Sequence, residues 1–192
     1  MPDNLIVSTQ HCDVKPDNFV LSSFRCAGNF FSEVPFSEVM LVDFGRAIDL
    51  EQCSSNPEDC QCPMFSGEAC KKEMQCPAMR EGRSWSSDID TFGILCSAHV
   101  LLFGELMQIK KDGKQWRPTS WLRRYYNRPL WGKIFNSLLD LDEGSGVALG
   151  SRPQNLRALR GMIDEYLETK RSHLKGELVR LENLLPKSRD DL

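Results

Sequence analysis

The sequence contains a stretch of 14 residues without a charged side chain, from Thr91 to Gly104, directly after two aspartates. A membrane-spanning helix needs about 20 apolar residues, so this stretch is too short to cross a bilayer. Ser86 or Ser87 can cap a helix at its start. Because a helix that is apolar on nearly all sides belongs in the middle of a core, we expect a buried helix over about residues 87–105. Its apolar residues are Ile89, Phe92, Ile94, Leu95, Ala98, Val100, Leu101, Leu102 and Phe103.

The length and composition fit one globular domain, residues 1–192. The chain has 41% hydrophobic and 27% charged residues, which permits a sizeable core and argues against a disordered chain. A net charge of -3 gives no reason to expect a nucleic-acid or membrane binder. No basic segment followed by an apolar run opens the sequence, so we expect no secretory signal, reduced cysteines and a cytosolic or nuclear protein.

The other periodic segments predict a mainly α fold with a small β-hairpin. Two short β-type runs, at 19–22 and 39–42, predict strands joined by a long connection. Apolar residues at helical spacing predict an amphipathic helix over 130–141. Pro153 stands near the first turn of a last pattern, which predicts one long C-terminal helix from about 153 to 185.

Residues 50–82 show neither a helical nor a strand period, so we expect a long loop there. The gaps between its five cysteines are six, one, seven and five residues, whereas structural zinc sites usually pair cysteines two to four residues apart. Reduced thiols are therefore the favoured interpretation of the segment 53–76, and a zinc site is the alternative. The five are Cys53, Cys60, Cys62, Cys70 and Cys76.

Charge is unevenly distributed along the chain. Residues 1–109 hold 7 basic and 16 acidic residues, a balance of -9. Residues 110–133 hold eight basic residues and the single acidic residue Asp112, a balance of +7. This basic segment suggests a docking surface for an acidic protein face, with a solvated helix face as the commoner outcome of such a pattern.

The chemistry is concentrated in two short motifs. His11-Cys12-Asp13-Val14-Lys15-Pro16-Asp17-Asn18 comes directly before the first β-type run, and Asp43-Phe44-Gly45 follows the second, 25 residues after Asn18. Together they resemble the catalytic loop and the DFG motif of protein kinases. The resemblance implies a protein-kinase-like fold of which the chain carries only the C-lobe. Its catalytic loop would be 11–18, its DFG motif 43–45 and its activation segment 43–79.

The resemblance also implies a role for each polar residue of the motifs. Phosphoryl transfer needs a base beside the acceptor hydroxyl and oxygen ligands that hold magnesium on the phosphates. Asp13 would accept the proton of the hydroxyl, and Lys15 would neutralise charge on the transferred phosphoryl group. Asn18 and Asp43 would hold Mg²⁺ and so bind the cofactor ATP. A lysine two residues after the aspartate is what serine/threonine kinases carry, so Ser or Thr hydroxyls are the expected acceptors.

The start of the apolar helix supports the same family. Asp88-Ile89-Asp90-Thr91-Phe92-Gly93 resembles the D-x-W-x-x-G segment of the kinase F helix. In that family the aspartate holds the backbone of the catalytic loop. We take Asp88 as the candidate and Asp90 as its rival, and plain capping of the helix is the alternative for either.

The residues around the DFG motif point to a subfamily. The run from Asp43 to Leu50 resembles the Bub family of mitotic checkpoint kinases, as do Phe19 after Asn18 and the segment 102–104. This resemblance implies an ATP- and Mg-dependent serine/threonine kinase of the spindle assembly checkpoint. It would be nuclear, at the kinetochores of chromosomes, and otherwise cytoplasmic. Its expected partners are kinetochore checkpoint proteins and a protein substrate, such as a histone or a checkpoint protein, with no direct binding of nucleic acid or membrane.

Three features depart from the family pattern. Cys12 replaces the arginine of H-R-D, so control by a phosphorylated activation segment is less expected. Residues 76–79 stand where A-P-E closes the activation segment, with Ala78 near the position of its glutamate, so the usual ion pair is missing or replaced. Only ten residues precede His11, so we expect no N-lobe and a truncated fragment with very weak ATP binding and no useful turnover. The rival hypothesis is a pseudokinase-like scaffold that acts through the basic surface at 110–133.

Overall fold

The computed structural model describes residues 9–22, 38–53, 63–120, 122–139 and 152–184. Backbone contacts divide the chain into two compact units. The first comprises Met1–Asn18 and Leu41–Arg152, and the second Phe19–Met40 and Pro153–Leu192. Both kinase-like motifs lie in the first unit. Among the helices of the described ranges, none combines the length and apolar character needed to cross a bilayer.

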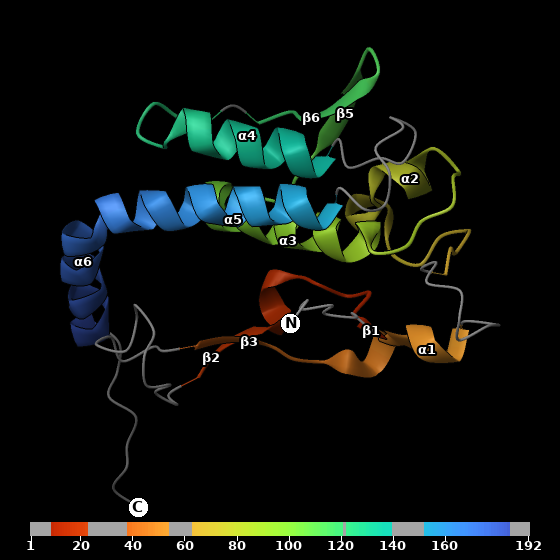
Figure 1. Ribbon diagram of the computed structural model, residues 1–192, viewed down its shortest axis with the longest axis horizontal. Coiled ribbons are helices and arrows are strands. Elements are labelled where there is room, and N and C mark those ends of the chain that lie inside the picture. Colours follow the sequence, from red (N-terminus) through yellow and green to blue (C-terminus); the bar gives the residue numbers. More distant parts are fainter. Residues whose placement is uncertain (1–8, 23–37, 54–62, 121, 140–151, 185–192) are drawn as a thin grey trace, which may run out of the picture. The chain divides into compact units, whose positions relative to one another are not determined.

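Two helices that pack together form the core of the first unit: α3, Asp88–Phe103, and α4, Arg128–Leu139 (Figure 1). The predicted helices at 87–105 and 130–141 are thus confirmed to within two residues, and α3 ends at Gly104, whose φ of 75° suits glycine. The prediction that α3 is buried on all sides is wrong, because Ile94 is 53% and Leu101 83% exposed. The buried apolar side chains of the two helices are Ile89, Phe92, Leu95, Cys96, Leu130, Ile134, Phe135 and Leu139.

Short helical turns interrupt the expected long loop. α1 is Leu50–Cys53 and α2 is Pro77–Arg80, with a 3-10 turn at Lys72–Met74 between them. Pro77 begins α2, where a missing amide hydrogen costs the helix nothing. Three residues of α2 are buried, so this part of the segment belongs to the core: Pro77, Ala78 and Met79.

Two antiparallel strand pairs also belong to the first unit. β1, Thr9–Gln10, pairs with β4, Ile48–Asp49, and so joins the chain before the catalytic loop to the chain after the DFG motif. β5, Ile109–Asp112, pairs with β6, Gln115–Pro118, through a tight turn at Gly113. A helix face was the commoner expectation for the basic segment, and for residues 109–118 it is wrong. Asp112 pairs with Gln115, so the turn residues are Gly113 and Lys114, and Gly113 has the positive φ, 62°, that the first residue of such a hairpin turn requires.

The second unit contains one strand pair and two helices. β2, Phe19–Ser22, pairs with β3, Glu38–Leu41, as the sequence predicted. The single helix predicted from about 153 to 185 is wrong, because the chain forms α5, Arg152–Thr169, and α6, Arg171–Leu184, which run in different directions (Figure 1). At the break, the hydroxyl of Thr169 donates to the carbonyl of Tyr166 at 2.7 Å, a local bond that competes with regular helical bonding.

Candidate active site

The backbone of the catalytic loop is held by an aspartate of α3. The amides of His11 and Cys12 donate to Oδ2 and Oδ1 of Asp90, at 2.8 and 2.7 Å. Cys12 has a φ of 61°, a conformation that L-residues rarely adopt. Bonds from two successive amides to one carboxylate hold the loop in this turn, so Asp90 fixes the direction in which Asp13 leaves the loop.

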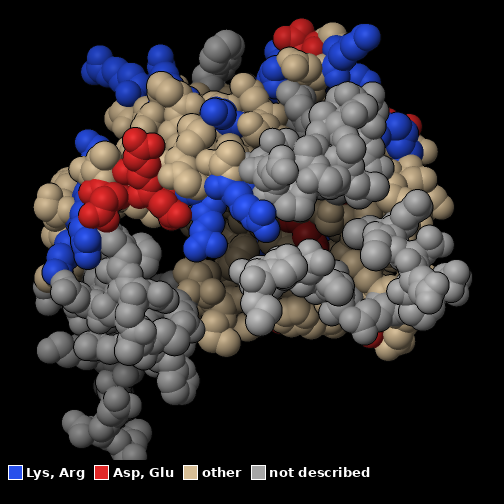
Figure 2. Space-filling view, in the orientation of Figure 1, with Lys and Arg blue, Asp and Glu red and all other residues tan. Residues whose placement is uncertain are grey.

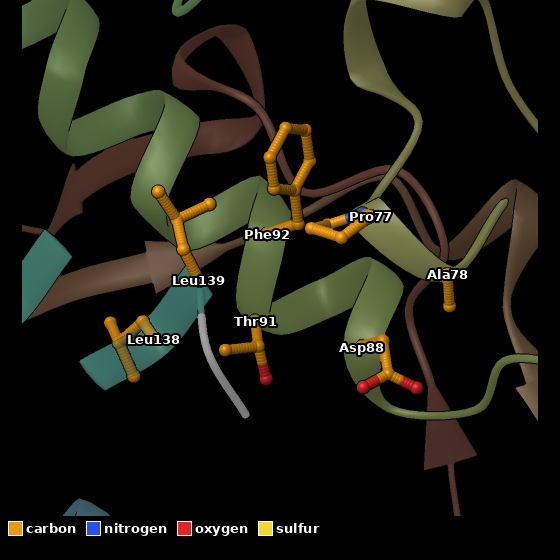
Figure 3. Close-up of a pocket in the computed structure, with 7 residues that line it drawn as sticks. All are labelled: Pro77, Ala78, Asp88, Thr91, Phe92, Leu138 and Leu139. Carbon is orange, nitrogen blue, oxygen red and sulfur yellow. The ribbon is translucent and has the colours of Figure 1, made fainter. Parts of the chain in front are cut away.

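The choice of Asp88 as the anchor is therefore wrong. Asp88 accepts a hydrogen bond from the amide of Ser86, at 3.0 Å, within the turn that begins α3. Figure 3 shows its carboxylate beside a small pocket where α2, α3 and α4 meet. One sequence signal could have identified Asp90: the family's motif has an aromatic residue two positions after its aspartate, and Phe92 stands two positions after Asp90.

The loop also approaches α3 very closely at Gly93. A Cβ atom at this position would lie 2.5 Å from the carbonyl oxygen of Val14 and 2.7 Å from its Cβ. Val14 is itself buried. Only glycine leaves room for the catalytic loop here, so α3 supports the loop by contact as well as by the hydrogen bonds of Asp90.

The structure brings Asp13, Lys15 and Asn18 together. The Nζ atom of Lys15 lies 2.7 Å from Oδ2 of Asp13. The Nδ2 atom of Asn18 donates to the carbonyl oxygen of Asp13 at 2.8 Å and approaches its Oδ2 at 3.4 Å. The other carboxylate oxygen of Asp13, Oδ1, lies 3.8 Å from Nη1 of Arg46 and has no hydrogen bond to a described residue. One oxygen of Asp13 is thus occupied within the loop, and the other can still accept a hydrogen bond.

These contacts change the pKa values of both charged groups. Partial burial alone would raise the pKa of Asp13, but the hydrogen bond and charge of Lys15, with smaller contributions from Arg46 and Asn18, hold it below its ordinary value. The hydrogen bond to Asp13 raises the pKa of Lys15, and the charge of Asp43 contributes to the increase. Asp13 is therefore a carboxylate and Lys15 an ammonium at neutral pH.

The DFG turn lies against the same loop. The amide of Val42 donates to the carbonyl of Asn18 at 2.9 Å, and Nε2 of His11 lies 3.0 Å from the carbonyl of Val42. The rings of His11 and Phe44 meet edge to face, with centroids 4.7 Å apart. These contacts place Asp43 directly beside the catalytic loop, so the four predicted site residues gather in one region of the first unit.

The donor atoms of this region suit magnesium. The Nδ2 atom of Asn18 is the donor in its hydrogen bonds, which leaves the amide oxygen as a ligand. Asp43 has a φ of 67°, and its Oδ1 lies over Gly45, where a Cβ would approach it to 3.3 Å. A glycine at this position thus keeps the space around the carboxylate open. One carboxylate and one amide oxygen, with phosphate oxygens, are a donor set that Mg²⁺ accepts.

Two further residues of this unit were not predicted. Arg46, in the 3-10 turn Phe44–Arg46, contacts Asp13 and also donates through Nη2 to the carbonyl of Ala69. Its position directly after the DFG motif was a signal for a charge near the site. Glu81 is the second residue, and no sequence signal marked it.

Glu81 forms ion pairs three residues after Ala78, close to the altered A-P-E segment. Its Oε1 lies 2.5 Å from Nζ of Lys111 and 2.9 Å from Nε1 of Trp116, and its Oε2 lies 2.7 Å from Nε of Arg83. The hydrogen bond from Lys111, helped by those from Arg83 and Trp116, lowers the pKa of Glu81 to about 2. These contacts join the end of α2 to the β5–β6 hairpin.

Burial makes the thiols near the site unreactive. It raises the pKa of Cys12 and Cys76 to about 11 and that of Cys96 to about 12. In the part of the chain that the structure describes, no three His, Cys, Asp or Glu side chains are grouped to hold a metal. Cys60 and Cys62 lie outside the described residues, so the choice between zinc and reduced thiols in the cysteine-rich segment stays a prediction.

The basic segment is divided over two places of the first unit. Lys110, Lys111 and Lys114 are exposed on or beside the β5–β6 hairpin, where acidic atoms stand among the basic ones (Figure 2). Arg123 and Arg124 are exposed in the turn before α4. Lys111 is engaged by Glu81. The segment is thus less uniform than its net charge suggested.

Comparisons with known proteins give consistent names, although no family model matches the chain. It is 27% identical to the mitotic checkpoint serine/threonine-protein kinase BUB1 of Mus musculus, over 88% of this chain and 15% of the relative. It is 29% identical to BUB1 of Arabidopsis thaliana, over 95% of this chain and 34% of the relative. The chain thus spans about a third or less of the length of these curated relatives.

A solved structure agrees with these relatives. The crystal structure of the BubR1 kinase domain matches with a TM-score of 0.73 and 28% identity, over 93% of this chain and 49% of that domain. The match over half of a kinase domain, with both motifs of the C-lobe in this half, confirms the predicted fold class. The chain is therefore similar to the Bub1 and BubR1 mitotic checkpoint kinases, and its fold resembles the C-lobe of a kinase domain.

Proposed function

We propose that this chain supplies the catalytic loop and the metal-binding residues of a serine/threonine protein kinase that uses ATP and Mg²⁺. The observation that carries the proposal is the asymmetry of Asp13. Its Oδ2 is held by Lys15, while Oδ1 has no hydrogen bond among the described residues. A carboxylate with one fixed and one open oxygen is suited to accept the proton of a Ser or Thr hydroxyl.

The other residues would act on the phosphates. Lys15, an ammonium 2.7 Å from Asp13, would neutralise charge on the phosphoryl group as it moves to the acceptor. Asn18 and Asp43 would hold Mg²⁺, which bridges phosphate oxygens and offsets their charge when bound. Asp90 and Gly93 would keep the catalytic loop in place while the acceptor binds, because both lie against the backbone of the loop.

The cellular role follows from the relatives' names. Relatives from mouse, plant and fission yeast are named mitotic or spindle assembly checkpoint kinases. We infer that the protein acts in the spindle assembly checkpoint, in the nucleus at kinetochores. Its substrate would be a Ser or Thr of a histone or checkpoint protein, with checkpoint proteins as its partners.

Thermal melting with and without Mg-ATP tests the metal site. It should be measured on this chain and on the longest natural polypeptide that contains it. A ligand that binds only the folded state raises the melting temperature. We expect Mg-ATP to stabilise the longer polypeptide more than the chain, and Asp43→Asn to abolish the effect. Asparagine tolerates the positive φ of Asp43, so this variant removes the charge without straining the turn.

Asp17→Asn is the matched control. Asp17 is an exposed residue of the neighbouring catalytic loop, and its substitution removes the same charge as Asp43→Asn. Its variant should keep the Mg-ATP stabilisation. If neither polypeptide is stabilised, the kinase proposal fails and the scaffold hypothesis, based on the exposed basic residues of 110–133, takes its place.

A further inference from the structure

The side chain of Arg46 joins three segments that are distant in sequence. It leaves the turn after the DFG motif, its Nη1 lies 3.8 Å from Oδ1 of Asp13, and its Nη2 donates to the carbonyl of Ala69. The backbone around Arg46 is also fixed, because Gln10 pairs with Ile48 two residues further on. The guanidinium thus lies between the catalytic loop and the activation segment.

Other contacts hold the far side of the activation segment. Phe65 forms two backbone hydrogen bonds with Trp85, at 2.8 and 2.9 Å, and Nε1 of Trp85 donates to the carbonyl of Gly67 at 2.9 Å. These bonds tie residues 65–67 to the start of α3. Among the described residues, no other hydrogen bond or ion pair joins residues 63–80 to the catalytic loop or the DFG turn.

The catalytic loop offers no alternative cation for this contact. The middle residue of its H-x-D motif is Cys12, a buried thiol whose pKa burial raises to about 11, so it is neutral and cannot pair with a phosphate. The ammonium of Lys15 is engaged with Oδ2 of Asp13. Among the described residues, Arg46 is thus the one whose side chain contacts both Asp13 and the activation segment, and a guanidinium can do this because its donors point in separate directions.

We propose that Arg46 is a positioning residue that holds the activation segment against the catalytic loop without any phosphate on that segment. The proposal rests on the kinase function proposed above for Asp13. In this arrangement Nη2 fixes the segment at Ala69, and Nη1 places a positive charge beside the open oxygen of Asp13. A surface arginine without this role would contribute nothing measurable to either segment.

Two variants of the full chain separate the two contacts. Arg46→Gln removes the charge. Arg46→Lys keeps a charge but has a single nitrogen, which cannot serve Asp13 and Ala69 together. Arg124→Gln, an exposed arginine of the turn before α4, is the matched control for loss of one charge. Because the Arg46 side chain is 51% exposed, we expect all three variants to fold.

Hydrogen exchange of residues 63–80, read by mass spectrometry, is the first measurement. We expect exchange about tenfold faster in both Arg46 variants, which is the size of effect that loss of a charge-assisted hydrogen bond produces. The control should exchange like the unmodified chain, and phosphatase treatment of the unmodified chain should change nothing. Unchanged exchange in the Arg46 variants, or faster exchange after phosphatase, would overturn the proposal.

The second measurement is hydrogen exchange of the catalytic loop, residues 11–18. Exchange should be faster in Arg46→Gln and stay close to its starting value in Arg46→Lys, whose single nitrogen can still reach Asp13, a split that a merely structural role would not produce. Equal exchange of the loop in all variants would overturn the contact with Asp13. Neither measurement needs phosphoryl transfer, so failure of the Arg46 proposal and failure of the kinase function give separate results.

Discussion

Asp13 and Glu81 are two carboxylates of the same unit with similar exposure, 18% and 22%, and both have lowered pKa values. Both oxygens of Glu81 are occupied, by Lys111 and Trp116 on Oε1 and by Arg83 on Oε2. Asp13 has one occupied oxygen and one open oxygen. Burial and charge are thus alike in the two carboxylates, and the number of satisfied oxygens is the difference on which the role proposed for Asp13 rests.

The two carboxylates also differ in which elements supply their hydrogen-bond partners. Lys15 and Asn18 come from the same loop as Asp13, so they position the carboxylate without tying it to another element. Lys111 and Trp116 come from the β5–β6 hairpin, so Glu81 joins two elements. We expect substitutions of Asp13 to affect chemistry and those of Glu81 to affect stability.

The substitution Asp13→Asn should have the largest effect, and that effect should be on catalysis. Loss of a general base should lower phosphoryl transfer by about 100-fold or more, measured with labelled ATP on the longest natural polypeptide that contains the chain. The free energy of unfolding should change by less than about 1 kcal/mol, because the hydrogen bonds of this side chain stay within its own loop and its one described contact outside the loop, to the half-exposed Arg46, is long. A variant that lost stability and activity in proportion would break the comparison with Glu81.

A second prediction concerns Asp90, the carboxylate that holds the backbone of the catalytic loop. Asp90→Asn leaves one of two loop amides with a weaker acceptor or none, and should destabilise the chain by about 1.5–3 kcal/mol in denaturant unfolding. Asp88→Asn removes a contact in the first turn of α3 and should cost about 1 kcal/mol or less. The opposite order would mean that Asp88 is the anchor after all.

These two aspartates show what the sequence could and could not predict. The motifs, α3 and α4 have local signals, and the structure places them where the sequence did. The choice between Asp88 and Asp90 depends on which carboxylate faces a loop some 80 residues away along the chain, which capping rules cannot decide. Arg46 and, apart from the neighbouring Arg83, Glu81 acquire their partners through tertiary contacts, so neither had a predicted role.

Two elements were missed for local reasons. The β5 strand reads Ile-Lys-Lys-Asp, which has too little apolar alternation to predict a strand, so the Gly113-Lys114 turn had no flanking strand signal. The break between α5 and α6 contains neither proline nor glycine at Lys170, so the apolar period ran through it. Weak patterns of this kind are overridden by tertiary packing.

The third prediction is that Glu81→Gln lowers stability at neutral pH by about 1–2 kcal/mol, because an amide cannot replace a carboxylate that accepts three charged or polar donors. The pH dependence has a definite sign. The folded pKa of about 2 lies below the ordinary value of 4.5, so the stabilisation is complete above pH 4.5 and is lost as pH falls towards 2. Thermal melts of the two proteins should therefore converge between pH 4.5 and 2. A difference in melting temperature that stayed constant over that range would mean that Glu81 stabilises the protein by something other than its charge.

The smallest effect is expected in the second unit. Arg160 and Asp164 form an exposed ion pair four residues apart in α5, at 3.6 Å. Asp164→Asn should change stability by about 0.5 kcal/mol or less, measured by denaturant unfolding at low salt. A loss as large as that of Glu81→Gln would show that partner geometry does not separate strong from weak carboxylates in this protein.

The most direct test of the account is to locate the metal nucleotide. Millimolar Mn²⁺ with ATP can be titrated into the labelled chain, and paramagnetic broadening of its amide signals reports even weak binding. The account predicts the strongest broadening at Asn18 and Asp43, less at Glu81, and none above background in Asp43→Asn. Strongest broadening at Glu81, or equal broadening with and without Asp43, would contradict the assignment of this region as the phosphoryl-transfer site.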